Sequence, residues 1–192
     1  PPLPRRSMTR CSVLFSDRNI SREDLADMFE AARWAPSSRN QQPWRYIVAT
    51  RETPDAYSAL FSCLEEGNRS WAGFAPVLGI SIAESVSEYK SRENIYARHD
   101  VGLSIASLIF QAVSVGIYVH IMGGFDSEKA RNELSIPDRF DPVAMFAAGY
   151  PAEITTGYPR EFVDREKQPR TRKSIEEILF YGKWNGRFQV EE

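Results

Sequence analysis

The side chains best suited to chemistry gather in the segment 35–44, which reads Ala-Pro-Ser-Ser-Arg-Asn-Gln-Gln-Pro-Trp. Serine, asparagine and glutamine supply hydrogen-bond donors and acceptors that can face a planar ligand rich in heteroatoms. Pro36 and Pro43 fix the backbone and remove two amide donors, so the helical pattern before them cannot continue. The segment therefore predicts a rigid polar loop between a core helix and a core strand, a common position for a binding site.

Two clusters of arginine near opposite ends of the chain could bind an anion. They are Arg5-Arg6-Ser7 and Arg170-Thr171-Arg172-Lys173. Guanidinium groups match phosphate oxygens with paired hydrogen bonds, although each cluster alone is more typical of a solvated surface. Because the sequence has neither a P-loop nor a GxGxxG motif, a bound phosphate would have to be held by side chains of this kind.

Two further candidates are single features. Gly123 and Gly124 follow a predicted strand, where a backbone N–H could approach a ligand closely, although an ordinary turn is the commoner explanation of such a pair. Asn68 lies between a predicted helix and a predicted strand, where it could cap the helix or bind a ligand. Neither feature identifies a site without the others.

No conventional catalytic group stands out in the sequence. His99 and His120 are far apart and lack carboxylate-rich surroundings, so metal ligation is not expected. Neither Cys11 nor Cys63 lies in an activating motif, and no GxSxG motif is present. Many binding groups without an obvious acid, base or nucleophile indicate chemistry that belongs to a bound cofactor.

Composition narrows the class of protein. The 192 residues suffice for one domain with a substantial core, and the net charge of −2 argues against binding to nucleic acid. No apolar run approaches the ~20 residues of a membrane span, and no signal-peptide pattern opens the sequence. Two cysteines without metal-type spacing favour free thiols. We therefore expect a cytoplasmic enzyme that binds neither nucleic acid nor a membrane.

The pattern of apolar residues predicts alternating helices and strands. Helices are expected at 22–34, near 54–66, at 96–115 and at 127–135, and strands at 44–50, 77–83, 117–122 and around 144–149. This alternation without internal repeats predicts a single α/β or α+β domain. Residues 84–95 look polar and mobile, and the tail after Tyr150 has no core pattern until Ile175. We expect the tail to wrap onto another surface, such as a second subunit.

Taken together and in order, these motifs resemble those of the nitroreductase-like FMN-dependent oxidoreductases. The resemblance is carried by Arg5-Arg6-Ser7, by 36–44, by Gly123-Gly124, by Gly149-Tyr150-Pro151 and by 169–173. It extends through nearly the whole chain and is weakest from about 51 to 95. It implies one α+β domain over residues 1–192, with a central mixed or antiparallel sheet flanked by helices. It also implies an intertwined homodimer, in which an extension from about residue 152 wraps the partner subunit.

The resemblance further implies two FMN sites at the subunit interface. Arg5, Arg6 and Ser7 would meet the phosphate and the ribityl chain, with Arg170 and Arg172 also on the phosphate. The partner subunit would line the isoalloxazine with Pro36, Ser37, Ser38 and Asn40, and with Gln42 near them. Asn68 would hydrogen-bond the pyrimidine side of the ring, and backbone N–H groups near Gly123 and Gly124 would approach flavin N5. No residue is expected to ligate a metal or to act as an acid, base or nucleophile.

The implied activity is an NAD(P)H oxidoreductase that reduces a nitroaromatic, a quinone or a similar electron-poor small molecule. Hydride would pass from NADH or NADPH to flavin N5 and then to the acceptor, in a ping-pong sequence. Two alternatives stay open: an FMN-binding sensor or storage protein without efficient turnover, and a specialised flavin enzyme of the dehalogenase or flavin-fragmenting type. The specialised enzymes usually carry an added lid, for which residues 84–95 look too short and polar.

Overall fold

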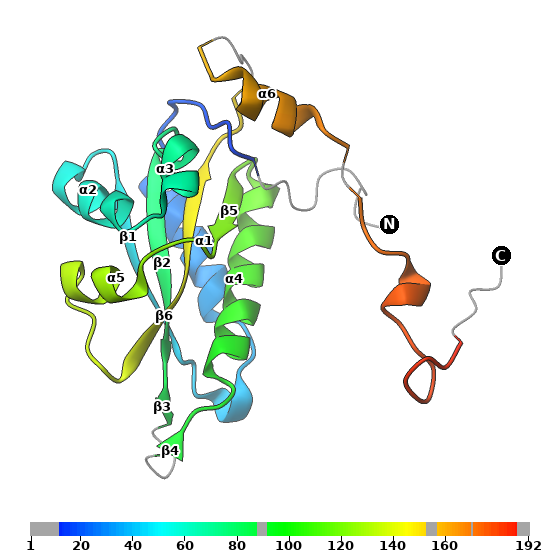
Figure 1. The fold of residues 1–192 in the computed structure, drawn as a ribbon. Coiled ribbons are helices and arrows are strands. Elements are labelled where there is room, and N and C mark those ends of the chain that lie inside the picture. Colours follow the sequence, from blue (N-terminus) through cyan, green and yellow to red (C-terminus); the bar gives the residue numbers. More distant parts are fainter. Residues whose placement is uncertain (1–11, 88–91, 153–156, 170, 188–192) are drawn as a thin grey trace.

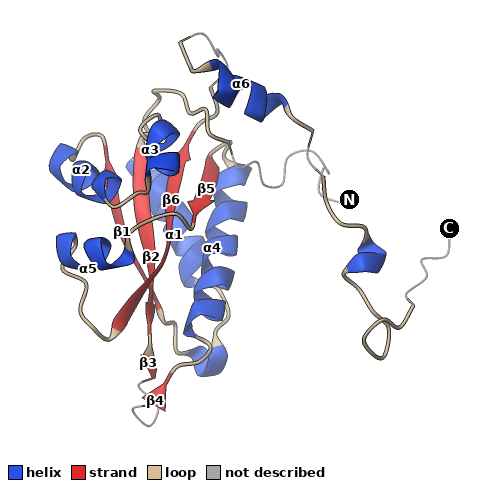
Figure 2. Cartoon of the chain, in the orientation of Figure 1, coloured by secondary structure: helices blue, strands red, loops and turns tan. Residues whose placement is uncertain are grey.

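The computed structural model describes residues 12–87, 92–152, 157–169 and 171–187. The helices are α1 (Arg22–Arg33), α2 (Pro54–Ser62), α3 (Glu66–Ala72), α4 (Ala97–Ser114), α5 (Ser127–Glu133) and α6 (Arg160–Lys167), with 3-10 turns η1 (Ser38–Asn40) and η2 (Ile175–Glu177). The strands are β1 (Trp44–Thr50), β2 (Val77–Glu84), β3 (Val86–Ser87), β4 (Arg92–Glu93), β5 (Tyr118–Met122) and β6 (Phe140–Gly149). Their arrangement can be followed in Figure 1 and Figure 2.

The four longer strands form one sheet in the order β1-β2-β6-β5, and each neighbouring pair is antiparallel. The short strands β3 and β4 pair with each other. Helices and an antiparallel sheet confirm the predicted α+β class, and of the two predicted kinds of sheet the antiparallel one is present. None of the helices in the described part of the chain has the length and apolarity that a membrane span needs.

The sheet carries helices on both faces, because alternate side chains along each strand are buried in different cores. Leu78 and Ile80 pack in a core with residues of α2, α3 and α5. Val77 and Phe146 point the other way and pack with residues of α1 and α4. Figure 1 shows α2, α3 and α5 together on one side of the sheet and α4 on the other. This division decides which predicted site residues can meet within one chain.

Local signals in the sequence correctly predict α1 and α4, the helices that pack on the face of the sheet where Val77 and Phe146 lie. The Ser21 hydroxyl accepts a hydrogen bond from the Asp24 amide at 2.9 Å, which caps α1 as expected for a serine at this position. Met28 and Ala32 are then buried at helical spacing. The helix predicted at 96–115 is α4, from Ala97 to Ser114.

The helix predicted near 54–66 is present as α2 but ends earlier, at Ser62, and the sequence did not indicate α3, which follows after a break at residues 63–65. The break pairs with the loop after β5: Glu65 N donates to Gly124 O at 3.1 Å, and Asp126 N donates to Cys63 O at 2.8 Å. Leu64 forms a β-bridge with Phe125. Tertiary pairing therefore interrupts the helical pattern, and it places α3 beside the Gly123-Gly124 turn.

The predictions for two polar segments also need correction. Residues 84–95 contain the end of β2 and the pair β3–β4, while 88–91 lie outside the described residues. The tail after Tyr150 forms α6, whose Phe162 is buried and lies against Phe74, with ring centroids 6.4 Å apart. Phe162 and Val163 are the only apolar residues of this eight-residue helix, and two adjacent positions give too weak a pattern to recognise. Residues 157–167 thus pack on their own subunit.

Gly79 in β2 leaves the space that the Phe146 ring occupies in the core between the sheet and helices α1 and α4. A Cβ at this position would lie 2.2 Å from Cζ of Phe146, whose ring is buried. We expect Gly79→Ala to lower the free energy of unfolding by about 1–3 kcal/mol, because overpacking forces the ring or the strand to shift. Urea unfolding measures the change, with Gly67→Ala in α3 as the control, since nothing lies within 4 Å of a Cβ there. A Gly79→Ala protein as stable as the wild type would contradict this packing.

Candidate functional site

The polar loop between α1 and β1 has an unusual backbone. Arg39, Asn40 and Gln42 adopt left-handed conformations, with φ angles of 54°, 55° and 48°. Residues other than glycine reach this region at an energetic cost, so fixed contacts must maintain it. Three such residues within four positions give this loop a fixed and unusual shape.

Several hydrogen bonds hold this loop in place. The Ser37 hydroxyl accepts from the Gln42 amide at 3.0 Å, and Arg45 Nη1 donates to Gln42 O at 3.0 Å. The Ser38 amide donates to Asp100 Oδ2 of α4 at 2.9 Å. Among the predicted ligand residues, Pro36 and Asn40 are exposed, whereas Ser37, Ser38 and Gln42 are half-buried. The loop is therefore both polar and well fixed, as predicted from its composition.

A second group of predicted residues meets on the other face of the sheet. Asn68 Nδ2 donates to Gly124 O at 2.9 Å. Asn68 lies within α3 and does not lie between a helix and a strand, so both its predicted location and its possible role as a cap are wrong. A Cβ on residue 124 would lie 2.9 Å from Asn68 Nδ2 and 3.0 Å from Glu65 Oε2, whereas nothing lies within 4 Å of a Cβ on Gly123. The turn therefore packs closely against α3 at Gly124, whereas space remains beside the exposed Gly123.

The loop and the Asn68–Gly124 pair do not come together within one chain. Ala35 and Trp44, at the two ends of the loop, pack against Ala97 and Val101 of α4, on the α1–α4 side of the sheet. Asn68 belongs to α3, which packs on the opposite face. The sheet and its two helical layers separate the predicted ring-binding groups of a single subunit.

Most of the predicted phosphate ligands cannot be placed. Arg5, Arg6, Ser7 and Arg170 lie outside the described residues. Arg172 is exposed, its Nη1 donates to the neighbouring Thr171 O at 2.8 Å, and it lies on the segment that leads away from the sheet in Figure 1.

The sequence did not indicate a contact between residues 12–13, which follow the first arginine cluster in the sequence, and Glu166, which precedes the second. Glu166 Oε2 in α6 accepts from the Ser12 hydroxyl and from the Val13 amide, each at 3.3 Å. The segment that follows the first cluster is therefore fastened to the helix that precedes the second. Nothing in the local sequence marks this contact, because its partners are more than 150 residues apart.

The titratable side chains near the site are structural. Burial raises the pKa of the Cys63 thiol, which donates to Ala59 O at 3.2 Å, so Cys63 is a poor nucleophile. His120 is buried, with Nδ1 at 3.0 Å from Ser12 O and its ring 4.3 Å from that of Trp71. Burial also raises the pKa of Tyr46 to about 12. Within the described residues, no three His, Cys, Asp or Glu side chains are placed to share a metal ion.

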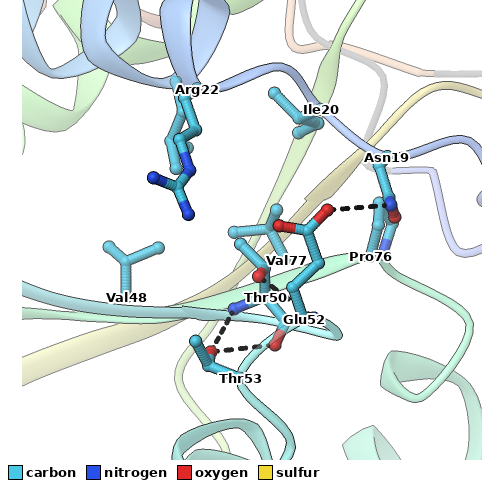
Figure 3. A pocket seen from close by; sticks show the side chains of 10 residues that line it. Asn19, Ile20, Arg22, Val48, Thr50, Glu52, Thr53, Pro76 and Val77 are labelled. Carbon is cyan, nitrogen blue, oxygen red and sulfur yellow. Dashed lines mark hydrogen bonds between the residues drawn. The ribbon is translucent and has the colours of Figure 1, made fainter.

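A cleft of about 250 Å³ lies elsewhere, between the start of α1 and the end of β1. Figure 3 shows the Arg22 guanidinium on one side of it and the Glu52 carboxylate on the other. Glu52 Oε1 accepts a hydrogen bond from Asn19 Nδ2 at 3.2 Å. None of the predicted site residues lines this cleft.

Comparison with known proteins agrees with the fold and the motifs. A family model described as "Nitroreductase family" matches residues 5–78. The relative named "Uncharacterized 15.4 kDa protein in ask 5'region", from Mycolicibacterium smegmatis, is 32% identical over 147 residues, which are 73% of this chain and 97% of that protein. A protein of Archaeoglobus fulgidus named "Putative NADH dehydrogenase/NAD(P)H nitroreductase" is 28% identical over 148 residues, 76% of this chain and 83% of its own length.

Solved structures extend the likeness to nearly the full chain. One described as "the oxidoreductase containing FMN" has a TM-score of 0.88 at 29% identity, covering 97% of this chain and 94% of that one. A nitroreductase family protein of Clostridium difficile 630 shares the fold at 21% identity, with a TM-score of 0.71 and coverage of 92% and 95%. These matches in sequence and in fold show that the chain belongs to the nitroreductase family.

Proposed function

We propose that this protein is an FMN-dependent NAD(P)H oxidoreductase that reduces an electron-poor small molecule such as a nitroaromatic or a quinone. The observation that carries the proposal is the contact between Asn68 and Gly124, which joins two residues that the family resemblance assigns to the flavin ring. A solved relative that is similar over 97% of this chain contains FMN, and a second relative is named as a putative NAD(P)H nitroreductase.

The described residues fit FMN in their chemistry. The isoalloxazine needs hydrogen-bond donors and acceptors along one edge and backbone that approaches closely, and Asn68 with the open Gly123 supplies both. The phosphate needs cationic donors, and the exposed Arg172 guanidinium is one. The polar loop adds half-buried groups at Ser38 and Gln42 without adding a charge from either side chain.

The site is completed by a second copy of the chain in this proposal. The loop and the Asn68–Gly124 pair lie on opposite faces of the sheet, so neither reaches the other within one subunit. A homodimer brings the loop of one subunit to the Asn68–Gly124 pair of its partner. The extension beyond α6, with its exposed apolar side chains, is proposed to wrap the partner subunit.

The protein side chains bind and orient, and bound FMN supplies the chemistry of accepting and passing on a hydride. Asn68 fixes the turn that would meet the flavin ring, and the loop closes the other side of the site and limits access of water. Neither Cys63 nor His120 is poised for proton transfer, since both are buried and engaged with backbone carbonyls. Protons are therefore expected to come from solvent.

Steady-state kinetics test this proposal. With NADH or NADPH and a nitroaromatic acceptor, we expect parallel double-reciprocal lines, because one open face of the site must serve both substrates in turn. Cys63→Ala is expected to keep turnover within about tenfold, a barrier change near 1.4 kcal/mol. Intersecting lines would contradict the shared face. Bound FMN without turnover of either nicotinamide would instead favour a sensor or storage protein.

A further inference from the structure

The carboxylate of Asp100 is buried in the first turn of α4, where only 3% of the side chain is exposed. Its helix neighbours Ala97 and Val101 pack with Ala35 and Trp44 from the two ends of the polar loop, so this turn of α4 lies against the loop. A charge in such surroundings is unfavourable unless hydrogen bonds compensate it. The position therefore calls for a specific role beyond solubility.

The two oxygens of this carboxylate have different partners. Oδ2 accepts from the Ser38 amide at 2.9 Å, and Oδ1 lies 2.9 Å from Nδ1 of His99, whose side chain is 67% exposed. The bond to Ser38 is the one that links the middle of the loop to the long helix. By contrast, the bond from the Gln42 amide to the Ser37 hydroxyl closes within the loop itself.

The loop requires such an external anchor. Arg39, Asn40 and Gln42 all hold left-handed backbone conformations, which the free chain seldom populates without glycine. The Ser38 amide directly precedes them, so fixing it also fixes where the unusual turn begins. A charged acceptor makes this hydrogen bond stronger than a bond between neutral groups.

We propose that Asp100 is a positioning residue for cofactor binding: its buried carboxylate holds the Ser38 amide and so keeps the Ser37–Gln42 loop in the shape that receives the flavin ring of the partner subunit. The inference rests on the proposed function, because it assigns the loop to the flavin site. Asp100 itself touches neither the cofactor nor the substrate in this arrangement. Its effect passes through the loop backbone.

Two variants of Asp100 separate the loss of the hydrogen-bond acceptor from the loss of the negative charge. Asp100→Ala removes the acceptor, whereas Asp100→Asn keeps an oxygen for the Ser38 amide and removes the charge. The readouts are FMN affinity, from quenching of flavin fluorescence, and hydrogen exchange of the Ser38 amide in flavin-free protein. We expect Asp100→Ala to weaken FMN by about tenfold or more and to lose the protection of Ser38. Asp100→Asn is expected to recover part of both, because its amide oxygen still accepts from Ser38 but as a neutral and weaker acceptor.

A second pair tests the same bond from the loop side, should Asp100→Ala fail to fold. Ser38→Pro deletes the amide donor at the first residue of a 3-10 turn, where the extended Ser37 (φ −145°, ψ 156°) tolerates a following proline. Ser38→Ala deletes only the hydroxyl. Weaker FMN binding in Ser38→Pro than in Ser38→Ala reports the amide and supports the proposal.

Two results would contradict the proposal that Asp100 holds the loop. One is protection of the Ser38 amide that is unchanged in Asp100→Ala, and the other is FMN affinity in Asp100→Ala and Ser38→Pro equal to that of their paired variants. A wild-type protein that does not bind FMN would refute the proposed function instead. In that event, amide exchange in the flavin-free protein still decides whether Asp100 holds the loop.

Discussion

Replacing Arg170 and Arg172 together by alanine is expected to weaken FMN binding by about two to four orders of magnitude. Each guanidinium is proposed to hydrogen-bond the phosphate, and a hydrogen bond to a charged group contributes roughly 1.5–3 kcal/mol. Arg172 is exposed, and among the described residues its guanidinium donates to the carbonyl of the neighbouring Thr171, a contact that it can exchange for an anion. Titration of flavin-free protein with FMN, followed by fluorescence, measures the loss.

The control for this experiment must remove the same charge from a nearby segment that packs on its own subunit. Arg165→Ala with Lys167→Ala does so at two exposed positions of α6. We expect this control to bind FMN within about threefold of the wild type, because general electrostatic attraction is screened at physiological salt. If the Arg170 and Arg172 double variant purifies with full flavin occupancy, the phosphate site has been assigned to the wrong residues.

Ending the chain after Lys173 is expected to abolish the dimer and, with it, flavin binding. The segment beyond this residue exposes large apolar side chains, with 62% of Ile178, 75% of Tyr181 and 80% of Trp184 accessible in the single chain. Figure 1 shows the segment extending away from the sheet and its helices. Exposed aromatic surface of this kind marks an interaction site. Light scattering at micromolar concentration measures the mass of the particle.

A chain that ends at Val190 is the matched control, because it keeps every apolar residue of the extension and loses only Glu191 and Glu192. It should remain dimeric and retain flavin. The shorter chain should give monomers or aggregates without flavin. A folded, yellow monomer ending at Lys173 would show that the extension does not wrap a partner subunit.

The elements that local sequence patterns specify could be predicted, and those that long-range contacts decide could not. The four strands of the sheet and the helices α1, α4 and α5 follow from apolar periodicity and from signals such as the Ser21 cap. The break between α2 and α3 could not be predicted, because it depends on pairing of Leu64 with Phe125. Helix α6 could not be predicted from periodicity, because its two apolar residues, Phe162 and Val163, are adjacent and the other six are charged.

The same distinction applies to the candidate site. Asn68 and Gly124 could each be named from the sequence, but their contact spans 56 positions and depends on the fold. Asp100 could not be named at all, since an aspartate beside a histidine in the first turn of a helix usually faces solvent. Only the folded structure shows that its side chain is 3% exposed and accepts a hydrogen bond from the Ser38 amide, 62 positions away.

The separation of the loop from the Asn68–Gly124 pair by the sheet has a genetic consequence in the proposed dimer. A lesion in the loop and a lesion at Gly124 damage different halves of the site. In a cell that makes both defective versions, a mixed dimer contains one site assembled from two intact halves and one assembled from two damaged halves. Lesions on opposite faces of the sheet should therefore complement each other, whereas two lesions within the loop should not. A single gene would then contain two complementation groups, divided by the plane of the sheet.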